Sequence, residues 1–165
     1  MSRKSLTLVN QKLTHARLLL TALERAEGAT APALAEAVVG HLVCAYRHYL
    51  RELAENYQVR MPGSIHSEAS LSAALAMMDK HPSEAQELAD LRALPSSWVS
   101  EMHLTYERLW AYPAQSVASR ESAGLIPLVP LEDLDVAPLS SGQLREWYEK
   151  FQDMLQRHRE TSAEW

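Results

Sequence analysis

The chain has 165 residues, a mass of 18.5 kDa and a formal net charge of −5 at pH 7. Its single cysteine excludes a framework of internal disulfides, and it also excludes a zinc or iron–sulfur site built from several thiolates of one chain. Leu and Ala together number 48, whereas Val and Ile together number only 11. This composition favours an all-α fold over a sheet, and the length predicts one domain spanning residues 1–165.

An apolar stripe predicts a first helix from about Ser5 to Glu27. The apolar residues recur at alternating steps of three and four, which places them on one helix face: Leu6, Val9, Leu13, Ala16, Leu20 and Leu23. Gly28 then offers a left-handed stop.

A second long helix is predicted from Thr30 to about Tyr57. Thr30 can cap the helix, and Pro32 suits its first turn. Apolar residues again recur at steps of three and four: Leu34, Val38, Leu42, Ala45, Tyr49 and Leu53. Because the linker is only a few residues long, we expect a long antiparallel hairpin over about residues 5–57.

Three shorter helices are predicted between about residues 67 and 111. Their expected ranges are 67–80, 83–93 and 96–111. Ser83 and Gln86 match a capping box for the middle one. Glu84, Glu87 and Asp90 share a side of that helix, and we expect them to form a solvated face.

Residues 113–140 have a different character, because they contain four prolines and no helical period yet are strongly apolar. We expect an extended strap lying in a groove of the bundle, since a disordered linker would be polar. The alternative is an exposed docking segment, because residues 127–130 match a PxxP pattern. A terminal helix is predicted over about 141–159, with Ser140 as its cap.

Polar side chains with metal-binding chemistry form a stripe on the second helix. His41, Cys44 and His48 follow one another at steps of three and four, and the hairpin would bring His15 level with Cys44. These four residues are the candidate metal ligands. The alternative is that Cys44 is a small buried residue and that the histidines simply meet solvent or neighbouring segments.

Aromatic and basic residues also alternate on the second helix. We expect Tyr46 and Tyr49 to face the core, and Arg47 and Arg51 to form an exposed pair. These two arginines are candidate interaction residues, together with two tryptophans of the fifth helix, Trp98 and Trp110. Nucleic-acid domains show a denser basic face than this chain, so nucleic acid is not the expected partner.

Export and membrane insertion are not predicted. Lys12, His15 and Arg17 interrupt the stretch that a signal peptide would need to be apolar. The chain also has no run of about 18 uncharged apolar residues, so no membrane partner is expected. A free cysteine without an export signal predicts the reducing cytoplasm.

Motifs for cofactor binding and catalysis are missing from the sequence. It has no GxGxxG, GxxxxGK[ST], HExxH or GxSxG pattern, so we predict no cofactor and no catalytic residue. Arg60 and His66 have a spacing similar to that in HEPN-class helical ribonucleases. However, Pro62 and Gly63 lie between them and prevent a shared regular helical turn.

The layout of the whole chain resembles a small family of uncharacterised proteins of Pseudomonas and related gammaproteobacteria. The resemblance rests on the Leu/Ala-rich first helix, the run over residues 36–53, the Pro-rich segment and the aromatic terminal helix. It implies a bacterial cytoplasmic protein and supplies no site residues. We therefore predict a non-enzymatic interaction or adaptor protein. The alternatives are a metal-binding or catalytic protein that uses the His/Cys stripe of the second helix, and a weak nucleic-acid-binding module. Self-association is one option, because a helix with two apolar faces needs two partners.

Overall fold

The computed structural model describes residues 4–111 and 139–163, and within these ranges it contains helices and no strand. The α-helices are α1 (Lys4–Leu23), α2 (Thr30–Asn56), α3 (Glu68–Ala76), α4 (Ser83–Ala93), α5 (Trp98–Arg108) and α6 (Ser141–Ala163). A short 3-10 helix, η1 (Pro62–Ser64), follows α2. The predicted all-α class is therefore confirmed.

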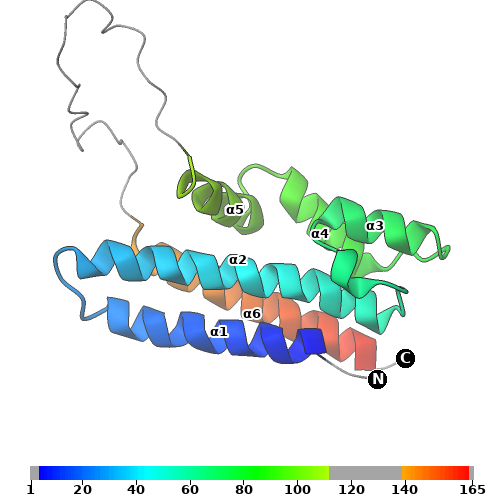
Figure 1. The fold of residues 1–165 in the computed structure, drawn as a ribbon, viewed down its shortest axis with the longest axis horizontal. Coiled ribbons are helices and arrows are strands. Elements are labelled where there is room, and N and C mark those ends of the chain that lie inside the picture. Colours follow the sequence, from blue (N-terminus) through cyan, green and yellow to red (C-terminus); the bar gives the residue numbers. More distant parts are fainter. Residues whose placement is uncertain (1–3, 112–138, 164–165) are drawn as a thin grey trace, which may run out of the picture.

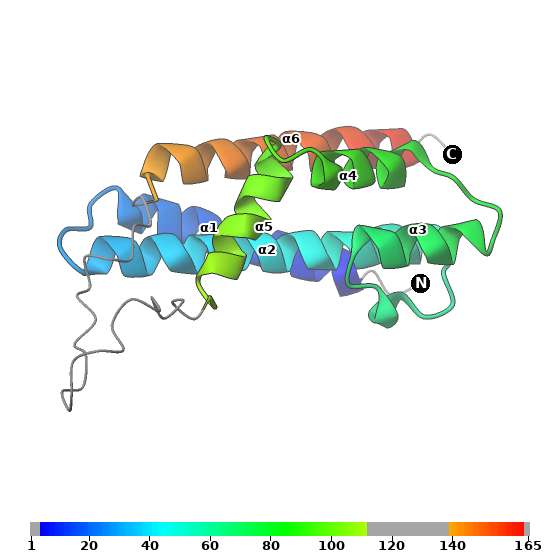
Figure 2. The same cartoon turned by 90° about the horizontal axis from the view of Figure 1, so that it is seen from above.

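Helix α2 is the central element of the fold. Helices α1 and α2 run antiparallel, and α6 lies along both of them (Figure 1). On its other side α2 contacts α3 and α5, and α5 crosses it at a steep angle (Figure 2). Both apolar faces of α2 are thus covered by helices of the same chain. On α1, by contrast, Leu18 is 56% exposed.

The predicted apolar stripe of the first helix is buried, and the helix ends earlier than expected. Val9, Leu13, Ala16, Leu20 and Leu23 are all less than 9% exposed. The chain then turns through a glycine with φ +56°, where a side chain would be strained. The predicted cap of α2 is wrong, because its N-cap is an alanine and no side chain caps it.

Capping differs among the shorter helices. Ser67 and Ser70 form a reciprocal capping box at the start of α3, and Ser97 caps α5. The capping box predicted at Ser83 is wrong. The N-cap of α4 is Pro82, and the Ser83 hydroxyl donates to the Glu84 carboxylate instead.

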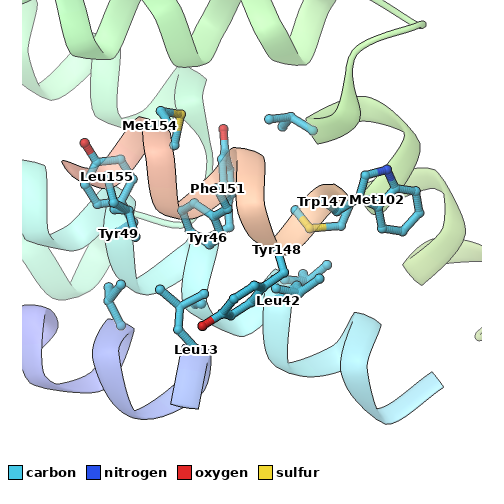
Figure 3. Close-up of a cluster of buried hydrophobic side chains, with 14 of the residues drawn as sticks. Leu13, Leu42, Tyr46, Tyr49, Met102, Trp147, Tyr148, Phe151, Met154 and Leu155 are labelled. Carbon is cyan, nitrogen blue, oxygen red and sulfur yellow. The ribbon is translucent and has the colours of Figure 1, made fainter. Parts of the chain in front are cut away.

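The core gathers aromatic side chains around α6 (Figure 3). The Phe151 ring is fully buried, and its centroid lies 5.6 Å from that of Trp98, 6.0 Å from that of Tyr46 and 6.3 Å from that of Tyr49. Trp147 is 2% exposed on the same helix face. Aromatic contacts therefore join α2, α5 and α6 in one core.

The predicted strap lies almost wholly outside the described residues. Its last apolar residue, Leu139, packs against the core, and Ser140 accepts a hydrogen bond from the Gln143 backbone N–H at 3.1 Å. The cap predicted for the terminal helix is therefore present, and α6 continues four residues beyond the expected end at 159. None of the described helices has the length and hydropathy that crossing a membrane requires.

Candidate functional site

The four candidate metal ligands lie along one side of the α1–α2 hairpin. The rings of His15 and His41 meet with their centroids 5.1 Å apart and their planes at 81°. Cys44 is a half-buried free thiol one turn further along α2. His48 is also half-buried, and its Nδ1 atom has no hydrogen-bond partner. The sequence analysis placed His15 level with Cys44. In the structure, the His15 ring contacts the ring of His41 instead.

Burial and a nearby lysine lower the pKa of two of these imidazoles, His41 and His48. Burial lowers the pKa of His41 below 6.5, and the charges of Lys12 and His15 lower it further. Burial likewise lowers the pKa of His48, with Arg51 and Lys12 adding to the effect. Within residues 4–111 and 139–163, no three His, Cys, Asp or Glu side chains are placed to hold one metal ion.

The four candidate interaction residues divide into two groups. Trp98 is only 9% exposed and packs on Phe151, so it belongs to the core. Arg51 is half-buried, and its Nε donates to the Ile65 carbonyl at 3.0 Å, which ties down the loop after α2. Arg47 is exposed, and Trp110 is 75% exposed. Only the last two are therefore available to a partner.

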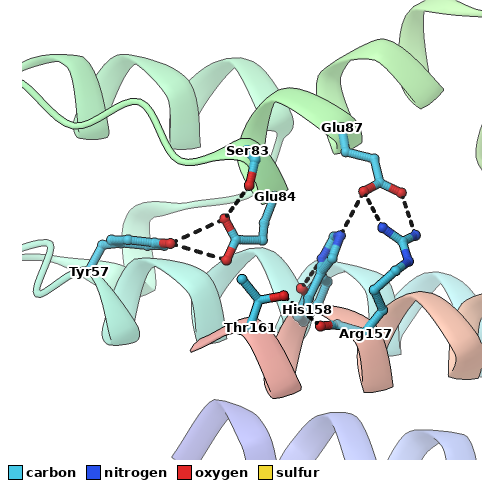
Figure 4. A network of polar contacts seen from close by, with 8 residues as sticks. Tyr57, Ser83, Glu84, Glu87, Arg157, His158 and Thr161 are labelled. Carbon is cyan, nitrogen blue, oxygen red and sulfur yellow. Dashed lines mark hydrogen bonds and ion pairs between the residues drawn. The ribbon is translucent and has the colours of Figure 1, made fainter. Parts of the chain in front are cut away.

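A buried polar network joins α2, α4 and α6, and the sequence did not predict it (Figure 4). The Tyr49 hydroxyl lies 2.6 Å from Nδ1 of His158, and Nε2 of the same ring lies 2.9 Å from Glu87. Arg157 donates to both oxygens of Glu87, at 2.7 and 2.8 Å. A neutral imidazole with its proton on Nε2 satisfies both contacts, because it accepts from Tyr49 and donates to Glu87.

This network resembles a catalytic His–carboxylate pair in composition, but its burial indicates a structural role. His158 is 4% exposed and Tyr49 is 1% exposed. Both ring nitrogens are engaged, so neither is left for a substrate. The position of His158 on the apolar face of the terminal helix was the one sequence signal for its burial.

The predicted solvated face of α4 is wrong for two of its three acids. Glu84 is 5% exposed, and both of its carboxylate oxygens lie 3.2 Å from the Tyr57 hydroxyl, which donates to them. Burial, together with this carboxylate, raises the pKa of Tyr57 to about 12. Glu87 is half-buried in the network above, and only Asp90 is exposed as expected. The Tyr57 side chain covers Glu84, and the Arg157 and His158 side chains of α6 cover Glu87, which explains the difference.

Glu87 is expected to make the stability of the fold depend on acidic pH. The hydrogen bonds from Arg157 hold the pKa of Glu87 at about 2, below the usual 4.5, although burial opposes them. Between about pH 4.5 and pH 2, the unfolded chain therefore binds a proton at Glu87 that the folded chain does not bind. The contribution of Glu87 is complete above about pH 4.5 and is lost as the pH falls through about 2.

Urea unfolding at a series of pH values between neutral and about pH 2 checks this expectation. Glu87→Gln should lose less stability than the wild type as the pH falls, because it has no carboxylate to protonate. Glu149→Gln, which changes an exposed acid of α6, is the matched control and should follow the wild type. Equal slopes for the wild type and Glu87→Gln would contradict the role assigned to this carboxylate.

The chain was compared with known protein families, curated proteins and solved structures, and one family matches it. No curated protein and no solved structure matches the chain significantly. A family model described as a family of unknown function matches residues 1–165, the whole length of the sequence. The chain therefore belongs to the family of unknown function DUF6586.

Proposed function

We propose that this protein is a non-enzymatic interaction protein of the bacterial cytoplasm and that it binds a partner protein at the end of α5. The contact surface consists of Arg47, Tyr106, Leu109 and Trp110, and is called the Trp110 surface below. The observation that carries the proposal is the 75% exposure of Trp110, the largest side-chain type, on a chain whose Trp98 and Trp147 are buried.

The geometry of the Trp110 surface supports this role. The rings of Tyr106 and Trp110 are 6.1 Å apart at an angle of 62°, and the Arg47 guanidinium carbon lies 5.4 Å from the Tyr106 ring centroid. Leu109 is 38% exposed beside them. Trp, Tyr and Arg are the residue types that contribute most of the binding energy in protein interfaces.

The chemistry of the surface indicates what its partner should present. An apolar side chain on the partner would cover the Trp110 ring, and a carboxylate would pair with Arg47. We also propose that residues 1–165 form a single domain. Support for this comes from α1 and α6, at opposite ends of the chain, which pack on each other and on α2.

Trp110→Ala is expected to weaken partner binding roughly 30-fold or more and to leave the fold intact. Because the side chain is 75% exposed, its removal should change the free energy of unfolding by no more than about 0.5 kcal/mol. Loss of an interface tryptophan costs about 2 kcal/mol or more of binding free energy, which weakens binding roughly 30-fold. Quantitative mass spectrometry of proteins that co-purify from the source cells identifies the partner. Titration with that purified partner then measures the loss.

Met77→Ala is the matched control, since Met77 is 90% exposed and lies at the end of α3. A partner should be retained by this variant and lost from Trp110→Ala. Sedimentation equilibrium of the purified protein tests self-association separately, and a dimer that dissociates in Trp110→Ala would make a second copy the partner. If Trp110→Ala retains every partner and the oligomeric state of the wild type, the proposal is wrong.

A further inference from the structure

The α1–α2 hairpin carries a seam of side chains that bind metals well, formed by His15, His41, Cys44 and His48. All four are half-buried. None of them makes a hydrogen bond or an ion pair with another described residue, although each lies next to charged or polar neighbours. Buried polar groups in proteins are normally satisfied, and the Nδ1 atom of His48 is buried without a partner, so this part of the seam calls for water or an ion.

The rings of His15 and His41 meet edge to face, and they lie as close to each other as two imidazoles on one ion do. A metal–nitrogen bond is about 2.0–2.1 Å long and a ring centre lies roughly 1 Å beyond the nitrogen, so two imidazoles on a tetrahedral ion have centres about 5 Å apart. The observed separation of the two ring centroids is 5.1 Å. An ion requires both rings to turn about their side-chain torsions until one nitrogen of each faces the same point.

We propose that His15 and His41 together bind one divalent transition-metal ion such as Zn²⁺, Ni²⁺ or Cu²⁺, with water in its remaining positions. Neutral imidazole is a good ligand for all three ions. Two protein ligands make an exchangeable site and not a closed structural one, in keeping with the absence of any three-ligand group among the described residues. Because one ligand comes from α1 and the other from α2, the ion ties the hairpin together.

The neighbours of the pair set its affinity. The positive charge of Lys12 lowers the pKa of both His41 and His48. The same charge repels a bound cation and so weakens its binding. His48 itself is seven residues from His41, about 10.5 Å along the helix, so it does not share the ion.

Isothermal titration of the untagged, chelator-treated chain with ZnCl₂ and with NiCl₂ tests the site. We expect one ion per chain, and His15→Asn and His41→Asn should each weaken binding at least about tenfold, since even residues behind a metal ligand cost 10–100-fold. A hundredfold excess over the dissociation constant should raise the Tm of the wild type by about 5–10 °C. Lys12→Ala should bind the ion more tightly than the wild type.

His66→Asn is the matched control, because this histidine is exposed and lies outside the seam. It should bind metal as the wild type does. The Tm of each metal-free variant shows whether the fold is intact before metal is added. No binding to the wild type, or binding that survives both His15→Asn and His41→Asn, would overturn the proposal.

Discussion

Replacing Arg159 by leucine is expected to destabilise the protein by about 3–5 kcal/mol, because it leaves a buried carboxylate without its partner. Glu52 on α2 is only 2% exposed, and both of its oxygens accept hydrogen bonds from Arg159 at 2.8 Å. Arg159 also donates to the Asn10 side chain at 3.1 Å, so it links α6 to α1 as well as to α2. Urea unfolding followed by circular dichroism measures the loss.

The double variant Glu52→Leu/Arg159→Leu separates the cost of an unpaired charge from the value of the ion pair. It should recover most of the stability lost in Arg159→Leu, since removing both charges leaves nothing buried and unpaired. Lys150→Leu is the control, because its ion pair with Glu146 is exposed and contributes less than about 1 kcal/mol. A double variant that is no more stable than Arg159→Leu would show that the cost arises elsewhere.

Phe151→Ala is expected to cost about 3–5 kcal/mol, the range for removing a large side chain from a packed core. The Phe151 ring is fully buried and contacts the rings of Tyr46, Tyr49 and Trp98. These rings belong to α2 and α5, so the resulting cavity would lie where three helices meet. The same urea titration gives the free energy of unfolding.

Two further variants test the origin of the effect at Phe151. Phe151→Leu fills most of the space and should cost clearly less than Phe151→Ala. Gln152→Ala, at the neighbouring exposed position of α6, should change stability by no more than about 0.5 kcal/mol. If Phe151→Ala lowers the free energy of unfolding as little as Gln152→Ala does, the aromatic cluster does not stabilise the core.

Local signals in the sequence were sufficient for the helices and for their buried stripes. Steps of three and four placed Val9, Leu13 and Leu20 on the buried face of α1, and Ser140 caps α6 as expected. These features depend on residues within a turn or two of one another, which is why periodicity and capping rules find them. Capping failed at Ser83, because the nearby Glu84 carboxylate accepts its hydroxyl.

The candidate site depended on contacts that no local pattern contains. The sequence singled out His15, His41 and Trp110, yet the meeting of the two histidine rings follows from the register of α1 against α2. Arg47 reaches the Tyr106 ring only because α5 crosses α2 at that height. The register of one helix against another is set by side-chain packing along their whole length, and a short window of sequence does not include it.

The sequence by itself thus determined the all-α class, the positions of the main helices and the residue types available for function. Only the tertiary structure decided which polar residues are buried and paired. Glu87 and His158 are 71 positions apart, and Glu52 and Arg159 are 107 apart. The physical reason is that a charged residue on a helix has the same local sequence pattern whether its side chain faces water or pairs with a distant residue. Only the packing of α6 on α2, and the contacts of α6 side chains with Glu87 of α4, distinguish the two cases.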